Sequence, residues 1–265
     1  MISPLAHIDP AAKIGKNVRI DPFAVIHAEV VIGEGSHIMS NAVIMEGAHI
    51  GLACTIFPGA VIGGIPQDLK FMGEKTTVEI GDNTTIRECV TVNRGTQDKW
   101  KTAVGKNCLI MAYAHIAHDC ILGDNVIIAN SVQLAGHVEI GDYAIIGGMA
   151  AAPQFTRIGA HTYIGGQSSI VKDVPPFIKA ARSPLSYAGV NSVGLQRRGY
   201  TSDTINEILD IYRHIYNKGL NITQALEYIS ENFKDTPEKK AILQFIQDSK
   251  KGIIKVHSKD FKDED

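Results

Sequence analysis

The 265-residue sequence is poor in aromatic side chains, which make up only 6% of it, and it has no long apolar run. Because hydrophobic residues still make up 45%, the core must be built from small aliphatic side chains. No segment approaches the roughly 20 consecutive apolar residues of a membrane span. The first residues, MISPLAHIDP, also lack the basic start and apolar stretch of a secretion signal. We therefore expect a cytoplasmic protein with no transmembrane segment.

The sequence has equally little cysteine and little excess charge of one sign. Its four cysteines lack the paired spacing of metal ligands, and a disulfide framework is not expected in a chain of this length. Lys and Arg number 26 against 28 Asp and Glu, so the formal net charge is −2. This balance gives no electrostatic argument for nucleic acid or for an anionic membrane as a partner.

What the sequence has in abundance is a six-residue repeat. Isoleucine, leucine or valine occupies 24 of the 25 positions that run in steps of six over residues 8–62, 80–92 and 104–170. A helix cannot produce this period, because its apolar stripe recurs every three to four residues. A chance alternation in an ordinary β-sandwich would not hold its register over more than 160 residues.

A second lattice lies two residues before the first and holds mostly small side chains, such as Ala24, Cys108 and Ala150. Residues two apart on a strand share a face, so each unit points one large and one small side chain inward. Three six-residue units make an 18-residue coil, and stacked coils bury a continuous aliphatic rod. We therefore predict a hexapeptide parallel β-helix, whose usual hand is left.

The pattern divides the chain into two domains. Residues 1–190 are predicted to form the β-helix, with looped-out insertions near 63–79 and 93–103, where the lattice is interrupted and resumes in phase. Residues 191–265 are predicted to form an α-helical domain, because an apolar stripe of helical period begins near Thr201. We expect further helices over about 223–233 and 236–249.

Three histidines stand outside both inward lattices. His115 and His118 flank a lattice isoleucine and are expected to project outward, and His137 follows His118 by about one coil and is expected to lie close to it. Such a cluster fits general acid–base catalysis, because imidazole titrates near neutral pH. It also fits a zinc site of three histidines shared between subunits, or ordinary surface positions on a binding rod.

Longer motifs resemble those of a known family. Six segments closely resemble, in the same order, the UDP-N-acetylglucosamine acyltransferases that open lipid A biosynthesis: PQDLKFMGE (66–74), IRECVTVNRGT (86–96), AHIAHDC (114–120), LAGHV (134–138), IIGGM (145–149) and GVNSVGLQRRG (189–199). The resemblance covers essentially the whole chain. It implies a homotrimer of left-handed β-helices with active sites in the clefts between subunits. It also implies transfer of an (R)-3-hydroxyacyl group from acyl carrier protein to the 3-hydroxyl of UDP-N-acetylglucosamine.

The resemblance also implies roles for single residues. His118 matches the general base, which removes the proton of the sugar hydroxyl as that oxygen attacks the thioester. Gly136 matches the position whose backbone N–H faces the developing oxyanion. Gly166 matches the residue that limits acyl length, and a glycine there implies long chains. No acyl-enzyme, metal or cofactor is implied, because the phosphopantetheine of acyl carrier protein carries the acyl donor.

Further positions match the family's substrate contacts. These are Asp68 and Lys70 on the first loop, His115, Asp119, His137 and Gln154 in the cleft, and Asn191, Arg197 and Arg198 near the helical domain. We expect the two loop residues to meet the histidines of a neighbouring chain. Arginine suits phosphate through its planar fork of donors.

Two positions depart from the family pattern. Pro153 stands where a pocket histidine is expected, and Val193 stands where a glutamate is expected. Proline has neither ring nitrogens nor a backbone donor, so that contact to the sugar head group is absent.

Three alternatives stay open at this point. The N-acyltransferase of the same pathway shares the fold but usually carries an additional N-terminal domain, for which a repeat beginning at Ile8 leaves no room. A zinc-dependent enzyme of the carbonic anhydrase kind would be distinguished by metal analysis. A non-catalytic binding scaffold would show no acyl transfer.

Overall fold

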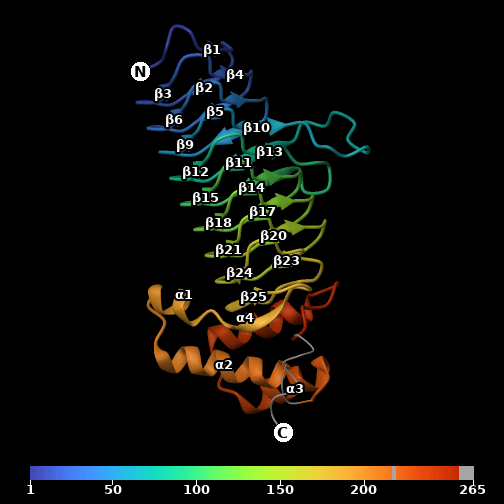
Figure 1. Ribbon diagram of the computed structural model, residues 1–265. Coiled ribbons are helices and arrows are strands. Elements are labelled where there is room, and N and C mark those ends of the chain that lie inside the picture. Colours follow the sequence, from blue (N-terminus) through green and yellow to red (C-terminus); the bar gives the residue numbers. More distant parts are fainter. Residues whose placement is uncertain (217–218, 257–265) are drawn as a thin grey trace.

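The computed structural model describes residues 1–216 and 219–256. Short parallel strands stack into a three-sided rod, a loop projects from one side of the rod, and the helices lie together at its C-terminal end (Figure 1). The fold is the predicted left-handed parallel β-helix with C-terminal helices.

Three sheets, here called the first, second and third sheets, form the sides of the rod. The first, eight-stranded sheet contains β1 (His7–Ile8), β4 (Val25–Ile26), β7 (Val43–Ile44), β10 (Val61–Gly64), β13 (Thr91–Asn93), β16 (His115–Ile116), β19 (Gln133–Leu134) and β22 (Ala151–Ala152). The second, also eight-stranded, contains β2 (Lys13–Ile14), β5 (Val31–Ile32), β8 (Ala48–Ile50), β11 (Thr77–Ile80), β14 (Lys101–Val104), β17 (Ile121–Leu122), β20 (Glu139–Ile140) and β23 (Arg157–Ile158). The third, ten-stranded sheet contains β3 (Arg19–Ile20), β6 (His37–Ile38), β9 (Thr55–Ile56), β12 (Thr85–Ile86), β15 (Leu109–Ile110), β18 (Ile127–Ile128), β21 (Ile145–Ile146), β24 (Tyr163–Ile164), β25 (Ile178–Ala181) and β26 (Ser186–Val190).

The interior of the rod is an aliphatic column. Lattice side chains such as Ile44, Ile86 and Ile128 are completely buried, and burying one of them stabilises the fold by about 1.5–3 kcal/mol. Two cysteines belong to the same interior. Burial raises the pKa of Cys108 to about 11 and that of Cys120 to about 12, so neither thiol is a nucleophile at neutral pH.

The corners between sheets repeat one backbone conformation in every coil. Asp119, His137 and Phe155 occupy the corner between the first and second sheets in three successive coils, with φ of 60°, 63° and 62°. Residues other than glycine rarely adopt this left-handed conformation, and the strand ladders on both sides hold these residues in it. Side chains of successive coils therefore form columns along the outside of the rod.

Two loops leave the rod without disturbing its register. Ala48 of β8 pairs with Val78 of β11, and Val78 pairs with Thr102 of β14. These separations exceed an 18-residue coil by about 12 and about 6 residues. Because both insertions are whole multiples of the repeat, the lattice residues keep facing inward beyond each loop. Here the first loop is the segment between β10 and β11, and the second loop is the segment between β13 and β14.

Beyond residue 170 the rod ends in elements that the repeat does not predict. β25 and β26 pair antiparallel, and the short helix α1 (Ser192–Arg197) follows them. Prolines in this stretch interrupt both periodicities, which is why the sequence pattern missed the hairpin. The later helices fall close to the predicted ranges, as α2 (Ser202–Tyr216), α3 (Ile222–Asn232) and α4 (Pro237–Gln247). Residues 257–265, assigned above to the helical domain, lie outside the described residues.

The helices cover the last coil. Tyr212 of α2 is completely buried, and its hydroxyl donates a 2.6 Å hydrogen bond to the carbonyl of Pro176. Thr236 caps α4 by accepting from the N–H of Lys239, with a proline in the first turn. The open end of a β-helix exposes unpaired backbone groups, and this cap removes that exposure. None of the described helices has the length and apolarity that a membrane crossing needs.

Candidate active site

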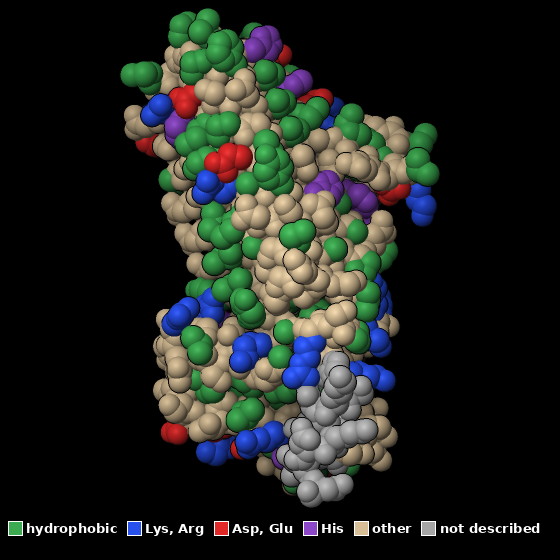
Figure 2. Space-filling view, viewed as in Figure 1, with side chains coloured by type: hydrophobic (Ala, Val, Ile, Leu, Met, Phe, Trp, Pro, Cys, Tyr) green, Lys and Arg blue, Asp and Glu red, His purple; other side chains and the backbone are tan. Residues whose placement is uncertain are grey.

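Histidine side chains gather on one face of the rod, beside the protruding first loop (Figure 2). His115 belongs to β16, and His118 and His137 lie at the corners that follow β16 and β19. All three lie outside the aliphatic core, but His118 is covered there, and its exposure is only 3%. Its ring packs against Gly136 of the next coil and edge-on to the ring of His137, at a centroid distance of 5.1 Å.

His118 is paired with the neighbouring carboxylate. Its Nδ1 lies 2.8 Å from Oδ2 of Asp119. Burial opposes ionisation of Asp119, but hydrogen bonds from Thr96, His118 and the backbone outweigh it, so the pKa of Asp119 lies below its ordinary value. An ionised carboxylate only accepts hydrogen bonds, so Nδ1 carries the proton of the imidazole. Nε2 is then the basic nitrogen, which is the arrangement that a general base needs.

The carboxylate of Asp119 is completely buried and accepts four hydrogen bonds. Oδ1 accepts from the N–H groups of Thr96 and Lys99, at 3.0 and 3.2 Å. Oδ2 accepts from the Thr96 hydroxyl at 2.7 Å and from His118. Asp119 was predicted as a substrate contact. Protein donors occupy both of its oxygens, so the carboxylate is placed to orient His118, and its contact with substrate stays a prediction.

Gly136 is a place where only glycine fits. A Cβ at this position would lie 2.5 Å from Cε1 and 2.7 Å from Nε2 of His118. The N–H of Gly136 donates to no acceptor within residues 1–216 and 219–256. At the corner between the second and third sheets, by contrast, the N–H groups of Lys106 and Asp124 donate to carboxylates of the next coil. An unpaired backbone donor thus lies beside the basic nitrogen, as an oxyanion site requires.

A groove opens over the first sheet at this point. Its volume is about 520 Å³, and His118 and Gly136 line it together with Gln67 of the first loop. Pro153 and Gln154 line the same groove. The substitution of the family histidine by proline therefore falls in the groove wall itself, next to a predicted substrate contact.

A second hollow adjoins the other side of the histidines. Asp68 and Lys70 of the first loop line it together with His137 and Phe155 of the same chain. The two loop residues therefore already lie beside His137 of their own chain, and their contact with the histidines of a neighbouring chain stays a prediction. The loop folds back beside the corner of its own rod, so one chain brings these predicted contacts together.

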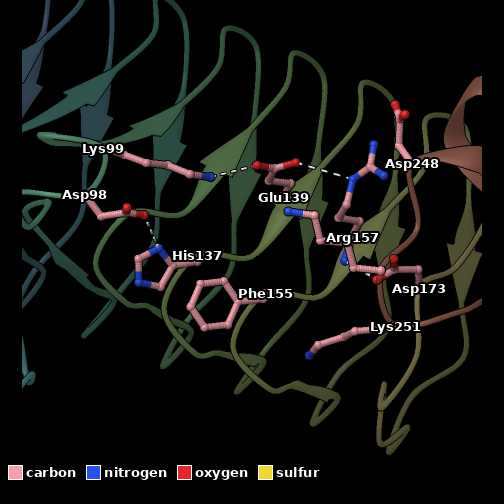
Figure 3. A pocket seen from close by; sticks show the side chains of 10 residues that line it. Asp98, Lys99, His137, Glu139, Phe155, Arg157, Asp173, Asp248 and Lys251 are labelled. Atoms are coloured by element: carbon pink, nitrogen blue, oxygen red, sulfur yellow. Dashed lines mark hydrogen bonds and ion pairs between the residues drawn. The ribbon is translucent and has the colours of Figure 1, made fainter.

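His137 lines the second hollow and is flanked by two carboxylates. Its ring stacks on Phe155, with centroids 4.4 Å apart. Nδ1 lies 3.1 Å from an oxygen of Asp98 (Figure 3), and Nε2 lies 3.8 Å from Oδ2 of Asp119. The Asp98 contact has the distance of an ion pair but not the directionality of a hydrogen bond, so Nδ1 has no hydrogen-bond partner among the described residues. A ring in this setting suits the binding of a polar group.

His115 also lines the groove, and its ring is paired with a hydroxyl and not with a carboxylate. Its Nδ1 lies 2.7 Å from the hydroxyl of Thr91. Burial, with a smaller contribution from nearby His118, lowers the pKa of His115. At neutral pH His115 is therefore a neutral hydrogen-bonding side chain.

The donor atoms of His118, Asp119 and His137 lie within 4.8 Å of one another, close enough for one metal ion. A carboxylate has about four lone-pair sites, and protein donors use all of them at Asp119. A cation would have to displace those donors. His115 is not part of the group, so these atoms differ from the three-histidine set considered above, which neighbouring subunits would share. The arrangement favours acid–base chemistry.

The predicted contacts near the helical domain lie elsewhere on the chain. Asn191 caps α1 by accepting from the N–H of Gly194, and it donates to the carbonyl of His161. Arg198 donates to the carbonyls of Gly194 and Tyr143, at 3.0 and 3.2 Å. Neither these two residues nor the exposed Arg197 lines either hollow beside the histidines. The structure of one chain does not bring this cluster to the groove.

Gly166 also lies apart from the groove, at the corner between the third and first sheets. A Cβ there would lie 3.1 Å from the carbonyl oxygen of Gly148, which is tight but not impossible. Thr96 and Lys99, which hold Asp119, were not found from the sequence. The one available signal was that Thr96 is the last residue of the motif IRECVTVNRGT.

The fold defines a hexapeptide-repeat protein, and its groove contains a buried histidine–carboxylate pair. The family model for the bacterial transferase hexapeptide (six repeats) matches residues 11–46 and 101–136. The model for the second domain of UDP N-acetylglucosamine O-acyltransferase matches residues 173–254.

Full-length relatives agree with these matches. A curated acyl-[acyl-carrier-protein]–UDP-N-acetylglucosamine O-acyltransferase from Chlorobaculum parvum is 60% identical over 186 residues, which cover 70% of each chain. One of the same name from Aquifex aeolicus is 52% identical over 198 residues, covering 74% of this chain and 76% of that one. The crystal structure of a UDP-N-acetylglucosamine acyltransferase from Bacteroides fragilis is 50% identical, with a TM-score of 0.95 over 96% of this chain and 100% of that one. The chain belongs to the UDP-N-acetylglucosamine O-acyltransferase family.

Proposed function

We propose that this chain is an acyltransferase that moves an (R)-3-hydroxyacyl group from acyl carrier protein to the 3-hydroxyl of UDP-N-acetylglucosamine, the first step of lipid A biosynthesis. The names of its relatives support the reaction. The observation that carries the chemistry is the buried pair of His118 and Asp119, which opens on a groove beside the unpaired N–H of Gly136. A cytoplasmic location stays a prediction.

In the proposed mechanism Nε2 of His118 takes the proton of the sugar hydroxyl while the hydroxyl oxygen attacks the thioester carbonyl carbon. Asp119 stabilises the resulting imidazolium through its 2.8 Å contact with Nδ1. The tetrahedral intermediate then collapses, the carbon–sulfur bond breaks, and the thiol of the phosphopantetheine arm leaves with the proton held by His118. No acyl-enzyme is needed, and no further cofactor takes part.

The N–H of Gly136 would stabilise the negative charge on the carbonyl oxygen. Removal of one such donor typically costs about 10²–10³-fold in kcat. We assign His115 and Gln154 to contacts with the substrates in the groove. We assign Asp68, Lys70 and His137 to substrate contacts in the adjoining hollow, where the two loop residues hold the sugar nucleotide.

We also propose that the working form is a homotrimer. Large apolar side chains at the corner between the third and first sheets are exposed although their positions repeat along the rod, with Phe23 at 60%, Tyr113 at 63% and Met149 at 65%. A neighbouring copy would bury them, and closed cyclic symmetry is the usual solution. In such an assembly Asn191, Arg197, Arg198 and Gly166 of one chain would serve the groove of its neighbour.

An acyl-transfer assay tests the proposal. The purified chain is incubated with UDP-N-acetylglucosamine and a series of 3-hydroxyacyl carrier proteins of different chain lengths, and the product is identified by mass spectrometry. We expect an O-acylated sugar nucleotide. Transfer only to the amine of a glucosamine acceptor would instead support the N-acyltransferase. Absence of transfer from every donor, together with stoichiometric zinc in the purified protein, would support the metal-dependent alternative.

A further inference from the structure

The second loop supplies most of the hydrogen bonds at the buried carboxylate. Of the four donors to Asp119, three belong to Thr96 and Lys99 of this loop. Thr96 is only 7% exposed, and Asp119 is 0% exposed. Water therefore does not replace these donors in the folded protein, and the orientation of the carboxylate depends on the loop.

The Thr96 hydroxyl is itself fixed in one orientation. It accepts a 3.3 Å hydrogen bond from the N–H of Asp98 and lies 2.7 Å from Oδ2 of Asp119. Because the carboxylate can only accept, the single hydroxyl proton of Thr96 is directed at it. The same Oδ2 atom accepts from Nδ1 of His118. One carboxylate oxygen thus connects the Thr96 hydroxyl to the imidazole.

The turn that carries these donors is fastened to the rod at both ends. At Gly95 the backbone N–H donates to the carbonyl of Thr77 at 3.1 Å, and a Cβ on Gly95 would lie 2.4 Å from the backbone nitrogen of Lys101. At the other end Nζ of Lys99 lies 2.7 Å from Glu139, which also lies 3.5 Å from Arg157 (Figure 3). The turn therefore cannot follow Asp119 if that side chain moves.

We propose that Thr96 is a positioning residue for acyl transfer, and that the Lys99–Glu139 ion pair fastens the turn on which it acts. Through Asp119, the Thr96 hydroxyl sets the orientation and tautomer of His118 without touching either substrate. This inference rests on the proposed acyltransferase activity. It means that the second loop, between β13 and β14, contributes to catalysis by positioning Asp119.

Other ionisable groups face the pair and must be considered in any pH measurement. His137 lies edge-on to His118, and Asp98 lies 3.1 Å from His137. His115 lies on the adjacent strand, close enough to His118 for their charges to interact. The ammonium of Lys99 points away toward Glu139. None of these ionisable side chains is hydrogen-bonded to the Thr96 hydroxyl, whose other partner is the backbone N–H of Asp98. A change confined to that hydroxyl therefore acts first on the carboxylate of Asp119.

The test compares Thr96→Val with Thr96→Ser in the full-length protein. Valine keeps the shape but removes the donor, and a hydrogen bond to a charged group corresponds to about tenfold or more in rate. We expect Thr96→Val to lower kcat by about tenfold with little change in KM, and Thr96→Ser to restore most of it. A carboxylate with one donor fewer stabilises the imidazolium more strongly. The acid limb of the kcat–pH profile should therefore move to higher pH.

A matched control separates this role from ordinary packing. Thr84 is also completely buried, donates to the carbonyl of Gly105 and accepts from the N–H of Cys108, but it lies away from the histidines. Thr84→Val should lower thermal stability without moving the pH profile. An unmoved profile in Thr96→Val, or a loss of kcat that Thr96→Ser does not recover, would overturn the proposal. If the valine variant does not fold, Lys99→Met provides the test, with an expected loss of up to about fivefold and no loss if the fastening role is wrong.

A measurement without substrates distinguishes this proposal from the proposed function. Ring-labelled histidine NMR follows the titration of His118 directly, with His118→Gln identifying its signal. We expect the midpoint to rise in Thr96→Val, and an unchanged midpoint would contradict the positioning role. Wild-type protein that transfers no acyl group would defeat the proposed function, whereas the shift of the His118 signal would still report whether Thr96 acts on the pair.

Discussion

Gly136→Ala is the most direct test of the site, because it replaces a hydrogen with a methyl group at a point where the structure has no room. The new Cβ would lie 2.5 Å from Cε1, 2.7 Å from Nε2 and 3.1 Å from Nδ1 of His118. Ordinary contacts of a Cβ start near 3.4 Å. The N–H of residue 136 is kept, so the variant tests the position of the base without removing the oxyanion donor.

The size of the effect follows from these distances. To restore ordinary contacts the imidazole must move by about 1 Å, and its 2.8 Å hydrogen bond to Asp119 cannot survive such a shift unchanged. Asp119 is held by three donors from the second loop and cannot follow. A misplacement of about 1 Å at a reacting group costs roughly 10²-fold, or about 2.7 kcal/mol of transition-state stabilisation. We therefore expect kcat to fall by about 10²-fold.

The assay is acyl transfer to UDP-N-acetylglucosamine under saturating donor, alongside a melting curve. Gly165→Ala is the matched control, because a Cβ there would meet nothing closer than 3.6 Å. The rod should fold in both variants, since Gly136 does not belong to the aliphatic core, although overpacking costs about 1–3 kcal/mol. Retention of more than about a third of the wild-type kcat in folded Gly136→Ala would refute the placement of His118 against this glycine.

The remaining predictions concern the base, the acyl groove, the assembly and acid stability. His118→Ala should lower turnover by about 10²–10⁴-fold with the fold intact by circular dichroism, and a rate above half of wild type would remove His118 from the mechanism. Gly166→Met should shift the chain-length profile toward shorter donors, since each buried methylene contributes about 0.8 kcal/mol, whereas an equal loss on all lengths would indicate only crowding against Gly148. Light scattering at active concentrations should give a trimer, and a monomeric mass would count against shared sites. Burial, helped by Arg198, lowers the pKa of His161 from 6.5 to about 4, so folding stability should fall as the pH drops from about 6.5 toward 4. The loss is at most about 3 kcal/mol, and less because the ring is partly exposed, and His161→Phe should flatten the dependence of Tm on pH in that range.

The rod could be predicted almost completely from the sequence, because one inward position in every six must be large and aliphatic. Aliphatic residues recur at this position from Ile8 to Ile170, and the structure buries most of these side chains. The hairpin of β25 and β26 could not be predicted, because the three prolines of the segment from residue 175 to 184 interrupt any regular pattern. Its two strands are defined by pairing with each other and with the last coil, which is a tertiary property.

The site was predictable only in part. Periodicity placed His115, His118 and His137 outside the core and near one another, since one coil separates successive members of a column. It could not show that Asp119 is buried, because the donors that bury it come from a loop whose path obeys no repeat. Thr96 meets Asp119 across 23 residues of sequence, a separation that matches no multiple of six. The sequence pattern also could not predict that the first loop folds back beside His137 and Phe155 of its own chain.

Because successive coils are joined by backbone hydrogen bonds, their spacing of about 4.8 Å is a property of the peptide unit and not of any side chain. Mutation of outward side chains therefore leaves the backbone distance between His118 and Gly136 unchanged, although it can change which side chain stands at each outward position. Removal of one residue from a coil would turn the later lattice positions outward, but removal of 18 would leave the ladders intact and put Phe155 where His137 now lies. Within the stacked coils, as opposed to the two loops, length changes safely only in whole coils, whereas an outward side chain can change at a single position.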